Sequence, residues 1–98
     1  MHVISQKTLR AFWARHPPAK NPLQAWFTRT KQAEWDSFED VKADFGSADQ
    51  VGRPTVFDIG GNKYRLIAHI HFNRGKVYVR QVLTHANYDK GAWKKDLQ

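Results

Sequence analysis

The sequence contains no cysteine and only one methionine among its 98 residues. The absence of cysteine excludes disulfide bridges, zinc sites built on thiolates and thiol nucleophiles. No apolar stretch approaches the length that spans a bilayer, and the N-terminal segment lacks the long apolar run of a secretory signal. We therefore expect a cytoplasmic protein that does not contact membranes.

Acidic residues are also scarce, since 9 Asp and Glu stand against 16 Lys and Arg, for a net charge of +7. The length predicts a single domain over residues 1–98. Hydrophobic residues at 41% and charged residues at 26% are typical of a globular protein. The positive excess favours a polyanionic partner, usually nucleic acid, but composition is equally compatible with a basic protein whose charge only prevents association.

The first half of the chain has apolar residues at helical spacing after a short strand at His2–Ile4. Ser5 is a typical N-cap residue for a first helix. Pro17 ends that helix, because the residue before a proline avoids the helical region. A second helix begins near Pro22, and a third follows a capping pattern at Ser37–Asp40.

The second half changes from helical to alternating spacing, after a polar loop over residues 47–54. Alternation predicts strands at Thr55–Ile59, Lys63–Phe72 and Lys76–Thr84, joined by turns at Gly60–Asn62 and Asn73–Gly75. The last strand is expected to place Val77, Val79, Gln81 and Leu83 on one face and Tyr78, Arg80, Val82 and Thr84 on the other. The polar tail from His85 is expected to hold a short helix that ends at Trp93-Lys94-Lys95.

This order predicts an α+β fold, in which N-terminal helices pack on one face of an antiparallel sheet. The sheet would comprise the short N-terminal strand and the C-terminal three-stranded meander. One sheet face is apolar and should meet the helices. The other face carries the cationic side chains, which are Lys63, Arg65, His69, His71 and Arg80.

A row of cations on an open sheet face is a candidate site for a phosphate backbone. Arginine adds bidentate phosphate contacts and can stabilise a phosphate whose negative charge grows in a transition state. The alternative that the alternation leaves open is a solvated polar face, which many antiparallel sheets have.

A second cluster of polar residues, Thr84–Lys90, follows the last strand. His85 can give or take a proton near neutrality, and Tyr88 can stack on a base, orient a phosphate or transfer a proton. RNA supplies its own nucleophile, the 2′-hydroxyl, so its cleavage requires a base, an acid and cations around the phosphorus, without metal or cofactor. Arg65, Arg80 and Lys63 could supply the cations, although a structural role for His85 or Tyr88 is the alternative.

His69 and His71 would share one strand face, which raises the possibility of a metal site. A site of this kind needs a third ligand, and no carboxylate or cysteine lies nearby in the sequence. We therefore expect no metal ion and no cofactor, and we assign His69, His71 and Lys90 to RNA binding.

Three segments together resemble the HigB toxins of type II toxin–antitoxin systems, which belong to the wider RelE-like group. They are Val3–Leu9, Val56–Leu66 and Val77–Lys90. The pattern Gly-Asn-x-x-Arg-Leu on one strand, with Arg-x-x-x-Thr-His-x-x-Tyr-Asp after another, is specific in combination. The resemblance covers nearly the whole chain, and it is weakest over Ser47–Pro54.

The resemblance implies a RelE-like fold and an endoribonuclease that cleaves mRNA on the translating ribosome. It implies a HigA-type antitoxin with a helix-turn-helix domain, with operator DNA bound only through the toxin–antitoxin complex. By motif, Arg65 is expected to contact phosphate, and His85 and Tyr88 to act in proton transfer or substrate orientation. Arg80 matches a family position as a catalytic or supporting residue, whereas Lys63 sits where the family varies.

Two alternatives remain beside a ribonuclease. One is a basic module that binds RNA or the ribosome without cleaving it, because fold does not fix function. The other is an interaction domain whose charge only docks an acidic protein.

Overall fold

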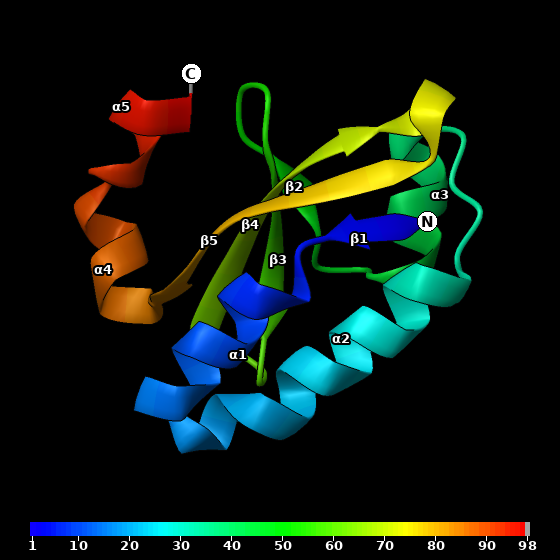
Figure 1. The fold of residues 1–98 in the computed structure, drawn as a ribbon. Coiled ribbons are helices and arrows are strands. Elements are labelled where there is room, and N and C mark those ends of the chain that lie inside the picture. The colour runs from blue at the N-terminus through cyan, green and yellow to red at the C-terminus, as the bar shows by residue number, and fades with distance from the viewer. Residues whose placement is uncertain (98) are drawn as a thin grey trace.

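A five-stranded sheet organises the computed structural model, which describes residues 1–97 and the side chains of residues 1–95 (Figure 1). The strands are β1 (His2–Ile4), β2 (Asp49–Gln50), β3 (Thr55–Ile59), β4 (Tyr64–His71) and β5 (Lys76–Thr84). The α-helices are α1 (Gln6–Arg15), α2 (Lys20–Gln32), α3 (Phe38–Asp44), α4 (His85–Lys90) and α5 (Trp93–Leu97). Short 3-10 turns occupy Pro17–Ala19 and Phe72–Arg74.

The strand order across the sheet is β1-β5-β4-β3-β2. The pairs β2–β3, β3–β4 and β4–β5 are antiparallel, which confirms the C-terminal meander and the α+β class. β1, however, lies parallel to β5 and not antiparallel as expected, with Val3 opposite Val77. The long connection through the N-terminal helices allows this parallel pairing, which a hairpin could not provide.

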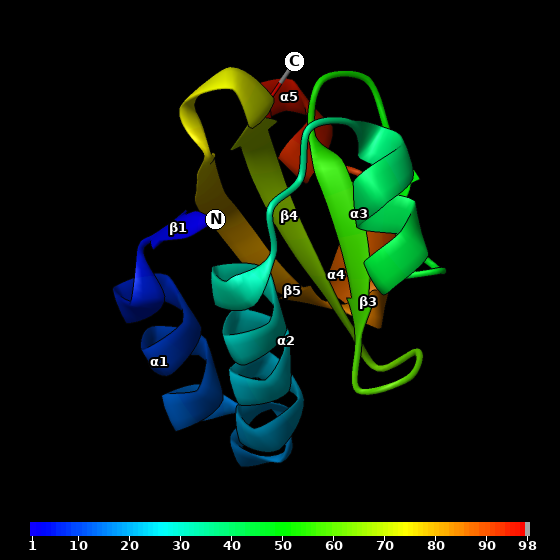
Figure 2. The ribbon, with the colours of Figure 1, turned by 90° about the vertical axis from the view of Figure 1, so that its right-hand side faces the viewer.

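Helices α1, α2 and α3 cover one face of the sheet, as Figure 2 shows with these helices in front. The main core forms between them and the sheet. Its fully enclosed side chains include Leu9, Leu23, Trp26, Phe57 and Leu66. The predicted apolar sheet face is therefore confirmed as the face that meets the helices.

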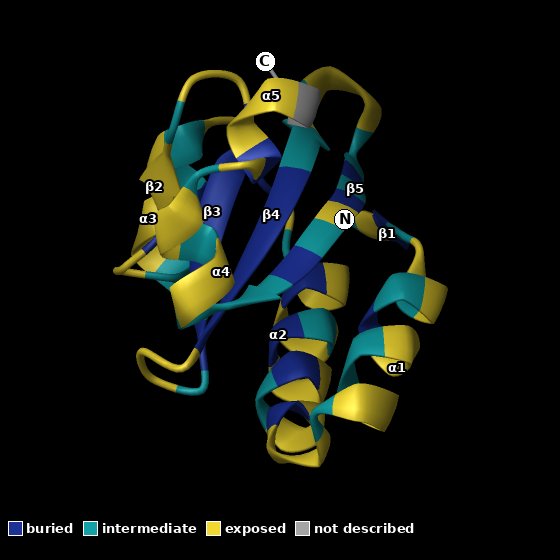
Figure 3. Cartoon of the chain, turned by 90° about the vertical axis from the view of Figure 1, so that its left-hand side faces the viewer, coloured by how far each residue is buried: buried dark blue, intermediate teal, exposed yellow. Residues whose placement is uncertain are grey.

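The opposite sheet face is less open than the sequence predicts. The tail forms α4 and α5, which fold back over this face (Figure 3). Trp93 is buried there against Val56 and Ile67, with Leu83 and Tyr88 packed around them. A second, smaller core thus covers part of the face that was expected to be open, because the tail holds two helices and a buried tryptophan.

The alternation predicted for the last strand fails at a β-bulge. Ile67 pairs with Gln81 and the next residue, Ala68, pairs with Val79, so Arg80 is the extra residue of β5. A bulge reverses the faces of the residues beyond it. Val77, Val79 and Val82 consequently belong to the main core, whereas Leu83 packs on the opposite face.

The helix boundaries differ from the predictions in detail. α2 begins at Lys20, two residues before Pro22, directly after the 3-10 turn. Ser5 and Ser37 hold the N-cap positions of α1 and α3, but neither side chain makes a capping hydrogen bond. In the predicted capping pattern, the Asp40 carboxylate instead accepts from the backbone N–H of Asp36 at 2.8 Å.

The loop predicted over residues 47–54 contains the two-residue strand β2, which the sequence analysis missed. Within residues 1–97, we find no helix with the length and apolar character that a membrane crossing requires.

Leu66 provides a test of this fold, because it is fully buried in β4 beneath the helices. We expect Leu66→Ala to lower the free energy of unfolding by about 2–5 kcal/mol, through lost apolar contacts and the cavity left behind. Urea denaturation measures the change. Arg10→Ala on the exposed side of α1 is the control, expected to stay within about 0.5 kcal/mol of the unmodified protein. Equal stability of the two variants would contradict the described core.

Candidate functional site

Helix α4 is fixed at both of its ends, and this places His85 and Tyr88. The Thr84 hydroxyl accepts a hydrogen bond from the backbone N–H of Asn87 at 3.2 Å and so caps the helix. Gly91, with φ of 74°, ends the helix in the left-handed conformation that glycine adopts without strain. The Trp93 indole N–H then donates to the Tyr88 carbonyl at 3.0 Å and ties α5 to α4.

The first residue of α4 is bound to the β3–β4 connection. The His85 backbone N–H, which has no partner within its own helix, donates to the Lys63 carbonyl at 2.9 Å. This hydrogen bond extends the pairing of β4 with β5, in which Thr84 lies opposite Tyr64 and Leu83 lies opposite Arg65. The sheet therefore brings the Gly-Asn-x-x-Arg segment and the Thr-His-x-x-Tyr segment together.

Arg65 lies at the centre of this site, and its side chain is only 9% exposed. Its Nε is 3.1 Å from Oδ1 of Asp58, which is directly opposite on β3. The two terminal nitrogens donate to the Tyr64 carbonyl at 3.0 Å and to the Asn62 side-chain oxygen at 2.5 Å, with a longer contact of 3.4 Å to the Asn62 carbonyl. The guanidinium is thus held on several sides by the protein itself.

Tyr88 covers Arg65 from above. The guanidinium carbon of Arg65 lies 5.5 Å from the centroid of the Tyr88 ring, within the range of a cation–π contact. The Tyr88 ring also stacks on Trp93, with 5.1 Å between centroids and an interplanar angle of 15°. Burial raises the pKa of Tyr88 above 10.0, and the Asp49, Asp58 and Asp89 carboxylates raise it too, although the Arg65 charge lowers it. At neutral pH the phenol is therefore a hydrogen-bond donor and not a phenolate.

His85 is held by the next turn of its own helix. Its Nε2 lies 3.0 Å from Oδ2 of Asp89, and the two side chains are 42% and 62% exposed. The Nδ1 atom of His85 is covered and has no hydrogen-bond partner among the described residues. A neutral imidazole that donates from Nε2 to Asp89 carries its lone pair on Nδ1.

The structure divides the predicted site residues into two groups. Lys63, Arg65, His85 and Tyr88 come together, and the exposed Lys90 ends the same helix as Tyr88. The remaining residues lie farther along the sheet: Arg80 at the bulge in the middle of β5, and His69 and His71 in the last part of β4. The contact of Arg65 with phosphate stays a prediction, and the contacts observed for its guanidinium are with protein groups.

Residues 19–91 match the family described as HigB_toxin, the RelE-like toxic component of a toxin–antitoxin system. This chain belongs to that family. It is 35% identical over 92 residues to the mRNA interferase toxin HigB of Escherichia coli (strain K12), with 91% of this chain and 88% of the relative covered. The mRNA interferase HigB of Shigella flexneri gives the same values. The mRNA interferase HigB of Escherichia coli O6:H1 is 28% identical over 93 residues, which cover 92% of this chain and 90% of the relative.

The site of this HigB-family chain contains three residues that the sequence analysis did not assign. They are Asp58 and Asn62, which hold Arg65, and Asp89, which holds His85. The sequence carried a signal for Asp58. A hairpin closed at Gly60–Asn62 can place Asp58 opposite Arg65, and opposite charges at such positions attract. Asp89 likewise follows His85 at the (i, i+4) spacing of a helix.

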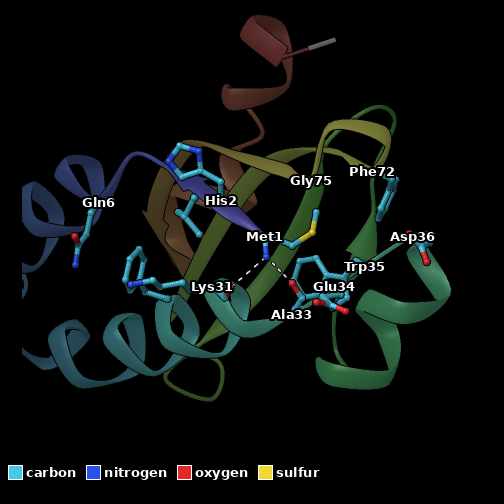
Figure 4. Close-up of a pocket in the computed structure, with 12 residues that line it drawn as sticks. Met1, His2, Gln6, Lys31, Ala33, Glu34, Trp35, Asp36, Phe72 and Gly75 are labelled. Carbon is cyan, nitrogen blue, oxygen red and sulfur yellow. Dashed lines mark hydrogen bonds between the residues drawn. The ribbon is translucent and has the colours of Figure 1, made fainter.

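A cleft of about 790 Å³ lies around the N-terminus, away from the candidate site residues (Figure 4). Its lining includes Phe27, Trp35 and Phe72, and the Met1 amine beside it donates to the carbonyls of Lys31 and Ala33. None of the predicted site residues lines this cleft. Among the described residues, no cluster of three or more His, Asp or Glu side chains is arranged to hold a metal ion.

The Asp58–Arg65 pair gives a first prediction for the site. Asp58→Asn should lower the free energy of unfolding by about 1–3 kcal/mol, because a largely buried guanidinium loses its charged acceptor. Urea denaturation measures the loss. Glu34→Gln, which changes an exposed carboxylate, is the control with little expected effect. An Asp58→Asn variant as stable as this control would show that the pair contributes nothing to the fold.

The pKa of Tyr88 gives a second prediction. Because burial raises the pKa of Tyr88, the phenol in the folded chain ionises above pH 10. The contribution of the neutral phenol to folding stability is therefore present below pH 10, and it is lost as the pH rises through the pKa of Tyr88 in the folded chain. Ultraviolet absorbance of phenolate, compared between the unmodified chain and Tyr88→Phe, isolates this titration from those of Tyr64 and Tyr78. A Tyr88 component that titrates below pH 10 would contradict the described burial.

Proposed function

We propose that this chain is the toxin of a type II toxin–antitoxin system and an endoribonuclease that cleaves mRNA. The observation that carries the proposal is the contact between Arg65 and Tyr88 at one end of the sheet, where helix α4 also begins with His85. These residue types are those that an attack by the RNA 2′-hydroxyl requires, namely a proton acceptor, a proton donor and a cation. The relatives carry the name mRNA interferase, which supports the same reaction here.

In this proposal His85 is the base. Asp89 accepts a hydrogen bond from the Nε2–H and fixes the tautomer, so that Nδ1 carries the lone pair, as the aspartate does for histidine in catalytic triads. Since Nδ1 is covered in the free chain, this role requires the groups that cover it to move aside when RNA binds. The base then removes the 2′-hydroxyl proton, and the oxygen attacks the adjacent phosphorus.

Tyr88 is the proton donor in the same step. Because its pKa is raised, its hydroxyl keeps its proton at neutral pH and can give it to the leaving 5′-oxygen. The P–O bond to the 5′-oxygen breaks as the 2′-oxygen bonds to phosphorus. The products are a 2′,3′-cyclic phosphate and a free 5′-hydroxyl.

Arg65 supports this chemistry from beneath Tyr88. Its guanidinium carbon lies 5.5 Å from the ring centroid and holds the phenol in place, so that the effect of Arg65 on the reaction depends on Tyr88. Lys63 and Lys90 are exposed beside the site and can contact neighbouring phosphates directly.

The biological setting is part of the proposal. The enzyme acts in the cytoplasm on mRNA in the translating ribosome, as a single domain without cofactor or metal. A HigA-type helix-turn-helix antitoxin neutralises it, and operator DNA is bound only through the complex. The net charge of +7 supports ribosomal RNA and mRNA as partners.

Expression of the chain in bacteria, with and without the neighbouring antitoxin gene, tests the function. We expect growth arrest that the antitoxin relieves, and primer extension should map new 5′ ends within translated messages. His85→Gln and Tyr88→Phe should each lower the cleavage rate about 10²–10⁴-fold, because each removes one proton-transfer group. Arg10→Gln, an exposed cation on α1, is the matched control with unchanged cleavage.

The outcomes separate the alternatives. Arrest of translation with intact message would favour a non-catalytic ribosome-binding module. Full cleavage by both His85→Gln and Tyr88→Phe would show that the reaction uses other residues.

A further inference from the structure

The basic side chains of the sheet and of helix α4 differ in whether a carboxylate lies beside them. Near Tyr88, Arg65 is paired with Asp58 and His85 with Asp89, at 3.1 and 3.0 Å. Arg53, His71 and Lys76 toward the other end, and Arg80 at the bulge in the middle of β5, have no carboxylate within 4.0 Å in the part of the chain that the structure describes. These four groups can bind an external anion without the loss of an internal ion pair.

Part of this second region forms a shallow hollow of about 270 Å³. Arg53 reaches it from the connection between β2 and β3, and His69 and His71 reach it from β4. The hollow has no acidic residue in its lining. Loops and strands far apart in the sequence therefore bring guanidinium and imidazole groups together.

An aromatic side chain borders the hollow. The Tyr78 and His71 rings meet edge to face, with 5.0 Å between centroids and an angle of 74°. On β5, Tyr78 lies opposite His69, and Lys76 lies opposite His71. Arg80 lies at the bulge of the same strand and is exposed. Cations beside an aromatic ring are the combination that single-stranded nucleic acid requires, because phosphates pair with the cations and bases stack on the ring.

The hollow lies on the same sheet face as the proposed catalytic cluster but apart from it. On β4, Ile67 stands between Arg65 and His69 and is covered by Trp93. Arg65 and His71 are six residues apart on the strand, which corresponds to about 20 Å. A phosphate bound at His71 is therefore not the phosphate that is cleaved.

We propose that Arg53, His71, Lys76, Tyr78 and Arg80 form a second binding site, which holds the phosphates and a base of the RNA strand at a distance from the cleaved bond. This inference rests on the proposed function, because the strand that it binds is the substrate. The site would fix the path of the mRNA across the sheet, whereas Arg65, His85 and Tyr88 would perform the reaction.

Fluorescence anisotropy with 2′-O-methyl RNA oligonucleotides, which cannot be cleaved, tests the site. We compare the full chain with an Arg53→Gln/His71→Gln variant, using lengths of ~3 and ~10 nucleotides. The variant should lose about fivefold to tenfold in affinity for the longer oligonucleotide, with a salt-dependence slope smaller by about 1–2, and should bind the shorter one unchanged. Lys7→Gln/Arg10→Gln on α1 removes two exposed cations from the opposite layer and should change affinity less than about twofold.

The possible results distinguish the sources of the bound phosphate. If both double variants lose the same affinity for the longer oligonucleotide, the effect is one of net charge and the proposal is overturned. The proposal is also overturned if the unmodified chain binds the longer oligonucleotide no more tightly than the shorter one. Loss of co-sedimentation with ribosomes at unchanged oligonucleotide affinity would assign the surface to ribosomal RNA and also overturn it. If the expected binding pattern is found in a chain that does not cleave mRNA, the second site stands and the proposed reaction fails.

Discussion

The candidate site depends on one buried guanidinium. Arg65 is enclosed between β3 and β4, where Asp58 balances its charge and Asn62 and the Tyr64 carbonyl take up its donors. A buried charge is tolerated only with such partners, because each lost partner leaves a desolvated donor. The same guanidinium supports the Tyr88 ring, so it links the β3–β4 hairpin to helix α4 in addition to the hydrogen bond from the His85 N–H to the Lys63 carbonyl. This link defines the position of the phenol relative to His85.

Much of this arrangement was predictable from sequence, because local signals were strong. The change from helical to alternating spacing identified the α+β class, and the turns at Gly60–Asn62 and Asn73–Gly75 located the meander. The two motifs identified Arg65, His85 and Tyr88 as candidate residues, and the strand register brings the segments that carry them side by side. Each of these features is set by neighbours within one hairpin or one short helix.

The features that sequence could not predict depend on contacts between distant segments. Alternation along the sequence cannot locate the extra residue Arg80, because apolar residues of β5 occur on both faces of the strand. The sequence of β5 therefore fits a regular strand as well as a bulged one. The two-residue strand β2 is too short for a periodic signal. The covering of the second sheet face depends on Trp93, a single apolar residue in a polar tail, which finds its partners Val56 and Ile67 only in the folded chain.

The distribution of charge follows from the same packing. Burial of Arg65 beneath Tyr88 requires a carboxylate beside it, and the Asp89 carboxylate orients His85, so each of these two side chains already has a carboxylate partner. Among the described residues, basic side chains without a carboxylate within 4.0 Å lie around them at Lys63 and Lys90, and at the end of the sheet beyond Trp93. This separation allows one group of residues to be arranged for proton transfer and another to attract RNA.

The central claim is that Arg65 acts through Tyr88. A double-mutant cycle on the mRNA cleavage rate, with Arg65→Gln, Tyr88→Phe and the combined variant, measures their coupling most directly. Our account predicts strongly non-additive losses, in which Arg65→Gln slows cleavage little further once the Tyr88 hydroxyl is absent. Fully additive losses would show that Arg65 contacts the RNA independently of Tyr88, and would contradict the account.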